Sequence, residues 1–134
     1  MKGIVVNYKK NKKIFIVEDN DLNLKLFKDL LEANGYDVSF TNDGLKAFVL
    51  IKEALPDLIL MDIQLKGVSG FDIIAEIKKD KTLKHIPVVA VTAFAMKDDK
   101  DKILASGCEE YISKPIAIEA FLETINHFVF KDKK

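Results

Sequence analysis

Short apolar runs alternate with longer stretches of mixed polarity along this chain of 134 residues. An uninterrupted run of about four apolar residues suits a strand that is buried on both faces of a sheet. Three such runs and two less apolar segments recur along the chain: Ile14–Val17, Asp37–Phe40, Leu58–Met61, Val88–Val91 and Glu110–Ile112. The pattern predicts five short strands, each followed by a segment long enough for a helix.

The segments between the strands carry apolar residues at helical spacing. This spacing predicts helices at about 20–35, 44–54, 70–79, 96–106 and 118–130, of which the fourth is the least amphipathic. Asn20 suits an N-cap, and Gly35 is well placed to end the first helix. The residues that trace the repeats are Leu22, Leu26, Phe27, Leu30 and Leu31; Leu45, Phe48, Val49 and Lys52; Phe71, Ile74 and Ile77; and Ile118, Phe121, Leu122, Ile125, Phe128 and Val129.

Strands that alternate with helices predict repeated βα units around a parallel sheet. Because the crossovers between parallel strands are right-handed, helices should cover both faces of that sheet. We expect a flavodoxin-like (βα)5 three-layer sandwich, with five parallel strands in the order 2-1-3-4-5. Residues 13–134 would form this single domain, and the lysine-rich residues 1–12 a flexible N-terminal extension.

Composition narrows the choice of function. Apolar residues make up 49% and charged residues 31%, which supports a folded core. The 21 basic and 21 acidic residues cancel, which argues against a nucleic-acid surface. All basic residues are lysines, so a phosphate would be bound by a lysine, backbone amides or a metal. The single cysteine, Cys108, suits a reducing cytosol, and we expect it to be a small buried apolar residue. No apolar run is as long as a membrane span or the core of a signal peptide.

Polar residues follow or close four of the predicted strands. They are Glu18 and Asp19, then Asp62, Thr92 and Lys114. The carboxyl ends of parallel strands meet at one edge, so these side chains should gather there. Three neighbouring carboxylates need a compensating cation, and Mg²⁺ prefers such oxygen ligands; Mn²⁺ could substitute. The aspartate after the third strand could accept a phosphoryl group, while the lysine neutralises one phosphoryl oxygen and the threonine hydrogen-bonds another.

The Lys114–Pro115 peptide bond is a candidate for the cis form. A cis bond directly after a strand could aim the lysine back over the edge of the sheet. Bond statistics alone favour the trans form, so both remain open at this point.

In order, spacing and context, these residues resemble the receiver domain of two-component response regulators over about Lys13–Lys131. The resemblance implies that Asp62 is the phosphoacceptor. It implies that Asp19 binds Mg²⁺ directly, that Glu18 acts mainly through water, and that the backbone carbonyl of Gln64 completes the metal site.

The same resemblance assigns a switch. Thr92 and Tyr111 would be the switch pair, in which the hydroxyl moves toward the phosphoryl group and the ring turns inward behind it. Gln64 and Phe94 would tune dephosphorylation by limiting the access of water.

Finer resemblance is to the DivK-type single-domain regulators of cell cycle and polarity, through VEDNDLNLKLFKDLLEANGYDV, DLILMDIQL, IPVVAVTAFAM and YISKPI. It implies a bacterial cytoplasmic protein that is recruited in some cases to membrane-bound kinases. This protein would take a phosphoryl group from the phosphohistidine of a sensor histidine kinase or of a histidine phosphotransfer protein. Its output to a downstream regulatory protein would use helix 96–106, strand 110–112 and helix 118–130. Nucleic-acid binding and membrane insertion are not expected, and a phosphorylation-dependent dimer stays open.

Two features depart from the usual pattern of the family. Lys66 stands where a proline is common after the phosphoacceptor, and the lysine-rich leader is longer than usual. Lys66 could loosen the loop or bring positive charge near the metal site. Neither feature changes the positions that carry the chemistry.

Two other classes of protein compete with a signalling module. A haloacid-dehalogenase-type phosphatase would need a general acid two residues after the nucleophile, where this chain has Gln64. We therefore expect no enzyme beyond a phosphoacceptor that promotes its own phosphotransfer and dephosphorylation. A receiver-shaped adaptor that signals without phosphate stays an alternative, while P-loop and dinucleotide enzymes lack their glycine fingerprints here.

Overall fold

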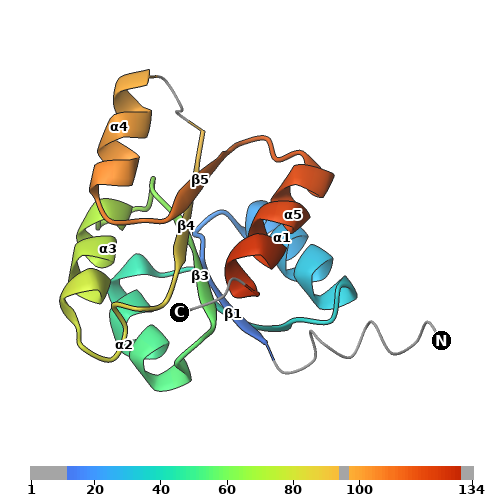
Figure 1. The fold of residues 1–134 in the computed structure, drawn as a ribbon, viewed down its shortest axis with the longest axis horizontal. Helices are drawn as coiled ribbons and strands as arrows, with labels where there is room; N and C mark the ends of the chain where they lie inside the picture. Colours follow the sequence, from blue (N-terminus) through green and yellow to red (C-terminus); the bar gives the residue numbers. More distant parts are fainter. Residues whose placement is uncertain (1–11, 94–96, 131–134) are drawn as a thin grey trace.

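The computed structural model describes residues 12–93 and 97–130, and it shows five βα units (Figure 1). The strands are parallel and lie in the order β2-β1-β3-β4-β5, which confirms the predicted topology. In chain order the elements are β1 (Lys13–Val17), α1 (Asp21–Ala33), β2 (Asp37–Thr41), α2 (Gly44–Ala54), β3 (Leu58–Asp62), α3 (Gly70–Lys79), β4 (Val88–Thr92), α4 (Lys97–Ala105), β5 (Glu110–Ser113) and α5 (Ile118–Val129). The segments 1–11, 94–96 and 131–134, which include most of the expected extension and Phe94, lie outside the described residues.

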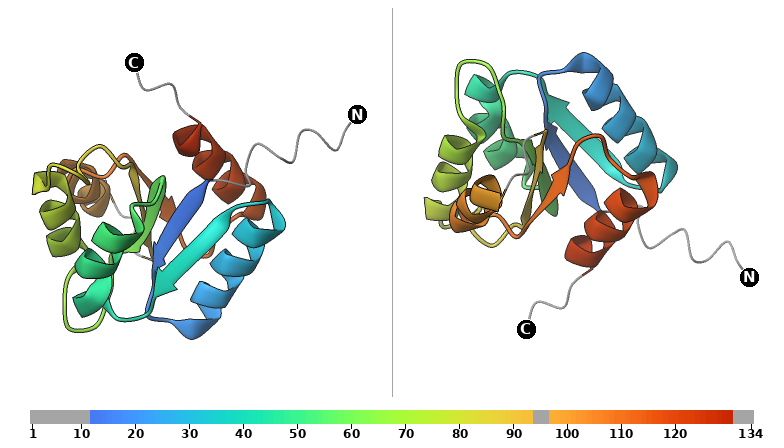
Figure 2. Two further views of the ribbon diagram at one scale, coloured as in Figure 1. Left: turned by 90° about the horizontal axis from the view of Figure 1, so that it is seen from below. Right: turned by 90° about the horizontal axis from the view of Figure 1, so that it is seen from above.

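Helices cover both faces of the sheet, which gives the expected three layers (Figure 2). Helices α1 and α5 lie on one face, and α2, α3 and α4 lie on the other. Each face has its own hydrophobic core, because alternate strand residues point to opposite sides. In β3, Leu60 packs toward α1 and α5, whereas Ile59 and Met61 pack toward the other layer.

Strand β3 lies at the centre of the sheet, between β1 and β4. All five of its residues are buried, as the uninterrupted apolar run predicts. Its last residue, Asp62, is only 3% exposed. The strand therefore delivers a carboxylate to the sheet edge from a rigid, packed position.

The apolar repeat of α1 was only partly a guide to its buried face. Phe27 and Leu31 are buried as predicted, but Leu24 joins them, while Leu22 and Leu26 are exposed. The Asn20 side chain accepts a hydrogen bond from the Asn23 backbone N–H, so the predicted cap is present.

In α2 the large apolar residues that trace the repeat point mainly outward. Leu45 and Val49 are exposed, whereas Gly44, Ala47 and Ile51 are buried against the sheet. A Cβ at Gly44 would lie 2.6 Å from a Val68 methyl carbon, so close packing favours glycine at this position. The predicted repeat was therefore only partly a guide to the buried face: Phe48 packs against the core, but Leu45 and Val49 do not become buried.

The other helices follow their predicted stripes more closely. In α3, Ile74 and Ile77 are buried together with Ile73, and Phe71 is half-buried. In α5 the buried residues are Phe121, Ile125 and Val129, whereas Ile118 is half exposed. Across the described ranges, no helix combines the length and apolarity that a membrane span requires.

The first residue of α3, Gly70, packs closely against the backbone of Asp62 and Ile63. A Cβ at Gly70 would lie 2.6 Å from the Asp62 carbonyl oxygen and 2.8 Å from the Ile63 Cα. Both are backbone atoms, so neither can rotate away. At Gly67 (φ +80°) a Cβ would have open space, and the only penalty is that of the left-handed backbone.

These two glycines allow a matched test. We expect Gly70→Ala to lower the free energy of unfolding by roughly 2–3 kcal/mol, because the new methyl group collides with fixed backbone. Gly67→Ala should cost about 1 kcal/mol, from backbone strain alone. Urea denaturation of both variants measures the difference, and equal losses would contradict the close approach at Asp62.

Candidate functional site

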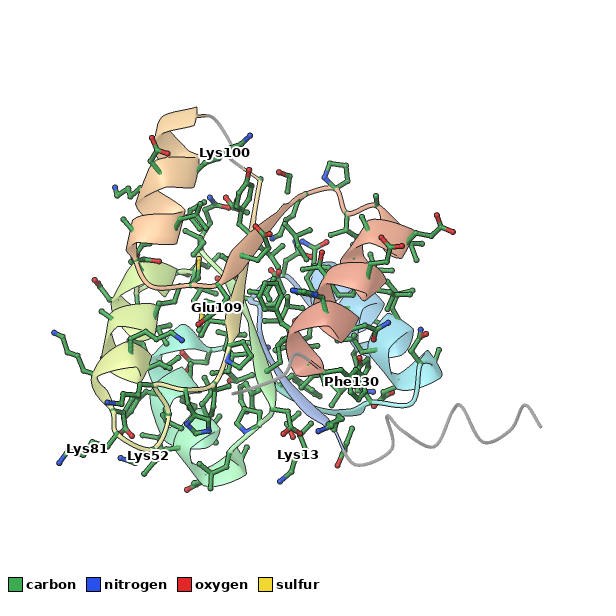
Figure 3. The ribbon with its side chains drawn as sticks, viewed as in Figure 1. Lys13, Lys52, Lys81, Lys100, Glu109 and Phe130 are labelled. Carbon is green, nitrogen blue, oxygen red and sulfur yellow. The ribbon has the colours of Figure 1, made fainter. Side chains whose placement is uncertain are left out.

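Four parallel strands bring the predicted polar residues to one end of the sheet. Glu18 and Asp19 follow β1, Asp62 closes β3, Thr92 closes β4 and Lys114 follows β5. Figure 3 shows the two ends of the molecule: Lys13, at the start of β1, lies opposite Lys100 of α4. The site lies at the carboxyl end of the strands, where open parallel sheets bind their ligands.

Three carboxylates form the centre of the site. Oxygen atoms of Glu18, Asp19 and Asp62 lie within 4.8 Å of one another. Two of these side chains are almost inaccessible, since Glu18 is 1% and Asp62 is 3% exposed. Such proximity places strong mutual repulsion in a poorly solvated position.

One ammonium group faces the two most buried carboxylates. The Lys114 Nζ lies 3.2 Å from Glu18 Oε1 and 3.4 Å from Asp62 Oδ2. The Lys114–Pro115 peptide bond directly after β5 is cis. A single lysine against three carboxylates leaves the fully ionised cluster about two charges negative.

The surroundings of Glu18 disfavour its ionised form. Burial, followed by a hydrogen bond with Asp62 and repulsion from that carboxylate, raises the pKa of Glu18 from 4.5 to about 7. Lys114 and the Asn20 N–H, which donates to Oε2, lower the pKa and offset only part of this rise. The other oxygen, Oε1, is buried and accepts no hydrogen bond, although it faces the lysine at ion-pair distance.

This donor set fits a divalent metal ion. Mg²⁺ and Mn²⁺ prefer carboxylate, carbonyl and water oxygens, whereas softer metals prefer sulfur or imidazole. The buried Glu18 oxygen without a hydrogen bond is an acceptor that a cation would satisfy. The residues to hold such an ion are Glu18, Asp19 and Asp62. Gln64 is adjacent, since its backbone N–H donates to Asp62 Oδ1 over 3.0 Å.

The loop between β3 and α3 also restrains Asp19. The Lys66 backbone N–H donates to Asp19 Oδ2 over 2.8 Å. A proline at position 66 has no N–H and could not make this bond. The departure from the usual family residue therefore adds a backbone contact to a predicted metal ligand.

Thr92 is held by a side chain whose direct contact the sequence did not reveal. The Gln64 Nε2 donates to Thr92 Oγ1 over 2.8 Å, and the Ala93 backbone N–H donates to Gln64 Oε1 over 3.3 Å. Thr92 itself is buried, whereas Gln64 is exposed. Residue spacing cannot show such a contact, because it depends on how Gln64 turns within the loop.

Tyr111 and Thr92 point to the same face of the sheet. Tyr111 pairs with Ala90, two residues before Thr92 in β4, and alternate strand residues share a face. Tyr111 is half-buried against the core under α2, α3 and α4. The Lys100 ammonium lies 5.7 Å from the centroid of its ring. This side of the sheet therefore connects the site to α4.

Comparison with known proteins defines the class. Residues 14–126 match the profile of the response regulator receiver domain, and the chain belongs to this family. More particularly, the polar-differentiation response regulator DivK of Brucella ovis is 56% identical over 118 residues, which cover 88% of this chain and 96% of that protein.

Solved structures agree with the fold. One is the receiver domain of sensor histidine kinase PA1611 from Pseudomonas aeruginosa, which has magnesium coordinated in its active-site cleft. It is 28% identical with a TM-score of 0.82, and the match covers 88% of this chain and 97% of that one. The phosphorylated cyanobacterial phytochrome response regulator RcpA is 31% identical with a TM-score of 0.78, and the match covers 92% of this chain and 96% of that one. Receiver domains are phosphoacceptors, and the acidic residues of a metal site are present here.

The raised pKa of Glu18 predicts a pH-dependent stability. Without metal, the folded state keeps a proton that the unfolded state releases at about pH 4.5, so unfolding becomes easier as the pH rises toward 7. Glu18→Gln carries no such charge. At pH 8 in EDTA we expect the variant to exceed the wild type by about 1–3 kcal/mol in free energy of unfolding, and to match it near pH 4.5.

Urea denaturation at a series of pH values measures this difference. Glu76→Gln, which changes an exposed carboxylate on α3, is the matched control and should follow the wild-type curve. Parallel pH dependence in the wild type and Glu18→Gln would show that Glu18 is ionised throughout.

Proposed function

We propose that this protein is a phosphorylation switch in which Asp62 accepts a phosphoryl group from a protein phosphohistidine. The observation that carries the proposal is the buried Asp62 carboxylate, which ends the central strand β3 between an ammonium group and two further carboxylates. The identity to DivK and the phosphorylated state of RcpA support it. The donor would be a sensor histidine kinase or a histidine phosphotransfer protein.

In the transfer, a carboxylate oxygen of Asp62 forms a bond to phosphorus. The phosphorus–nitrogen bond of the phosphohistidine breaks, and the imidazole leaves with its electron pair and gains a proton. Lys114, already 3.4 Å from Asp62, neutralises charge on the phosphoryl oxygens, and Thr92 donates a hydrogen bond to one of them. A Mg²⁺ ion held by Glu18, Asp19, Asp62 and the Gln64 carbonyl supplies further neutralisation of charge; Mn²⁺ could replace it.

Water can later attack the same phosphorus and release inorganic phosphate. This weak self-dephosphorylation is general to receiver domains, and no other enzymatic activity is proposed. Gln64 and Phe94 are proposed to tune its rate. Gln64 is exposed beside Asp62, whereas Phe94 lies outside the described residues.

The switch would run from Thr92 through Tyr111 to the face formed by α4, β5 and α5. The two side chains share one face of the sheet, so a shift of the hydroxyl toward a phosphoryl group opens space in the direction of the ring. A groove of about 450 Å³ lies beside this path, lined by β5, Pro115 and the α5 residues Ala120 and Thr124. A downstream regulatory protein, or a second phosphorylated copy, would bind there.

We place this switch in the bacterial cytoplasm, in cell-cycle or polarity signalling, with recruitment to membrane-bound kinases. The 56% identity to a polar-differentiation regulator supports that setting. Residues 13–134 are proposed to act as the receiver unit, with 1–12 as a flexible extension.

Phosphoryl transfer can be tested with the purified protein. Incubation with acetyl phosphate and Mg²⁺ should add one phosphoryl group per chain, visible by intact-protein mass spectrometry, and EDTA should prevent it. Asp62→Ala should abolish the addition, because the accepting carboxylate is gone. Asp29→Ala, which removes an exposed carboxylate on α1, should remain labelled. Labelling that persists in Asp62→Ala would overturn the assignment.

Output through a protein face predicts a partner that depends on the state of Asp62. We expect beryllofluoride-treated protein to capture at least one binding partner that untreated protein does not. Asp62→Asn should lose this difference, because it cannot form the beryllofluoride adduct. An adaptor that signals without phosphate would be favoured if the wild type and Asp62→Asn bind the partner equally, both with and without the cognate kinase.

A further inference from the structure

The Gln64 side chain is bound at both ends of its amide. Its Nε2 donates to Thr92 Oγ1 over 2.8 Å, and its Oε1 accepts from the Ala93 backbone N–H over 3.3 Å. The same residue contacts Asp62, because its backbone N–H donates to Oδ1 over 3.0 Å. One residue therefore connects the proposed phosphoacceptor to the proposed switch hydroxyl.

We propose that Gln64 is a positioning residue, whose amide holds the Thr92 hydroxyl in the resting state and so opposes its movement toward a phosphoryl group on Asp62. The proposal rests on the function proposed above. It assigns to the side chain a role separate from the metal contact of the backbone carbonyl and from the access of water.

The hydrogen bonds of the loop limit how far the amide can follow the threonine. Beyond its contact with Ala93, its loop is anchored at two points, where the backbone N–H groups of Gln64 and Lys66 donate to Asp62 and Asp19. If the Thr92 hydroxyl moves toward Asp62, the bond from Nε2 stretches unless this anchored loop also shifts. The resting state keeps that hydrogen bond, and the activated state loses or weakens it.

The size of the effect follows from a population argument. A contact made only in the resting state lowers the apparent affinity for any ligand that selects the activated state. A neutral hydrogen bond changes such an equilibrium by a few-fold, and the exposure of Gln64 to water puts this one at the low end. Removing the amide should therefore tighten the binding of a phosphoryl mimic about threefold.

The test uses Gln64→Met, which keeps the length of the side chain but has no amide. The apparent affinity for beryllofluoride is titrated at Mg²⁺ concentrations that saturate each variant, so a change in metal affinity does not enter. We expect about threefold tighter binding than in the wild type. Unchanged or weaker binding would overturn the proposal.

Gln64→Asn separates reach from polarity. It keeps the amide but is one methylene shorter, so it cannot span to Thr92 from the same backbone position. We expect Gln64→Asn to bind beryllofluoride as tightly as Gln64→Met does. If Gln64→Asn instead binds it with the wild-type affinity, the polarity of the loop and not the bond to Thr92 sets the affinity, and the proposal fails.

A double-mutant cycle identifies Thr92 as the partner. In a Thr92→Val background there is no hydroxyl to hold, so Gln64→Met should change the affinity by less than about 1.5-fold. A full threefold gain in that background would show that Gln64 acts elsewhere. Binding of beryllofluoride by the wild type tests the proposed function itself, whereas the ratios between variants test only the role of Gln64.

A spectroscopic readout distinguishes this role from a purely structural one. With fluorotyrosine incorporated and the resonances assigned by Tyr→Phe substitution, the Tyr111 signal of unliganded Gln64→Met should move toward its beryllofluoride-bound position. The Tyr36 signal, from a buried residue that contacts Asn126 of α5, should stay in place. A Tyr111 signal identical to that of the unliganded wild type would contradict a shift in the switch.

Discussion

Repulsion among buried carboxylates is the constraint on which the rest of this structure depends. Glu18 and Asp62 are almost wholly removed from water, and Asp19 lies beside them, yet among the described residues Lys114 alone offers a positive charge at ion-pair distance. A fold selected for stability alone would not retain such a cluster. The raised pKa of Glu18 records its cost, and a bound cation or a shared proton relieves it. The site is stable enough to exist because two packed cores hold the strands that carry it.

The sheet separates Asp62, the proposed phosphoacceptor, from Thr92, the proposed switch hydroxyl. By the alternation of strand residues, Asp62 continues the row of Leu60, toward α1 and α5, whereas Thr92 continues the row of Ala90, toward α2, α3 and α4. The two side chains therefore project to opposite faces of the sheet and share only its carboxyl end, where loops have more conformational freedom than the packed cores.

Much of this arrangement was predictable, because topology alone brings strand ends together. The apolar runs predicted β1, β3 and β4, and the parallel direction of the strands places Asp62, at the end of β3, and Lys114, after β5, at one edge. The buried face of α2 was not predictable from large residues alone, since it includes Gly44, where close packing against Val68 leaves little room for a side chain, and Ala47. The contact between Gln64 and Thr92 was also hidden, because it depends on side-chain torsions in a loop and not on any repeat.

The loop between β3 and α3 joins all parts of the site. Gln64 contacts both Asp62 and Thr92, while the Lys66 N–H holds Asp19. Lysine in place of proline supplies that last contact, so the departure from the family pattern strengthens the connection between loop and metal site rather than loosening it. The charge that the proposed phosphorylation adds at Asp62 would therefore act on a loop that is hydrogen-bonded both to Asp19, a predicted metal ligand, and to Thr92, the proposed switch hydroxyl. One short segment is thus hydrogen-bonded to Asp62, Asp19 and Thr92, so a displacement of any one of these three groups is felt by the same loop.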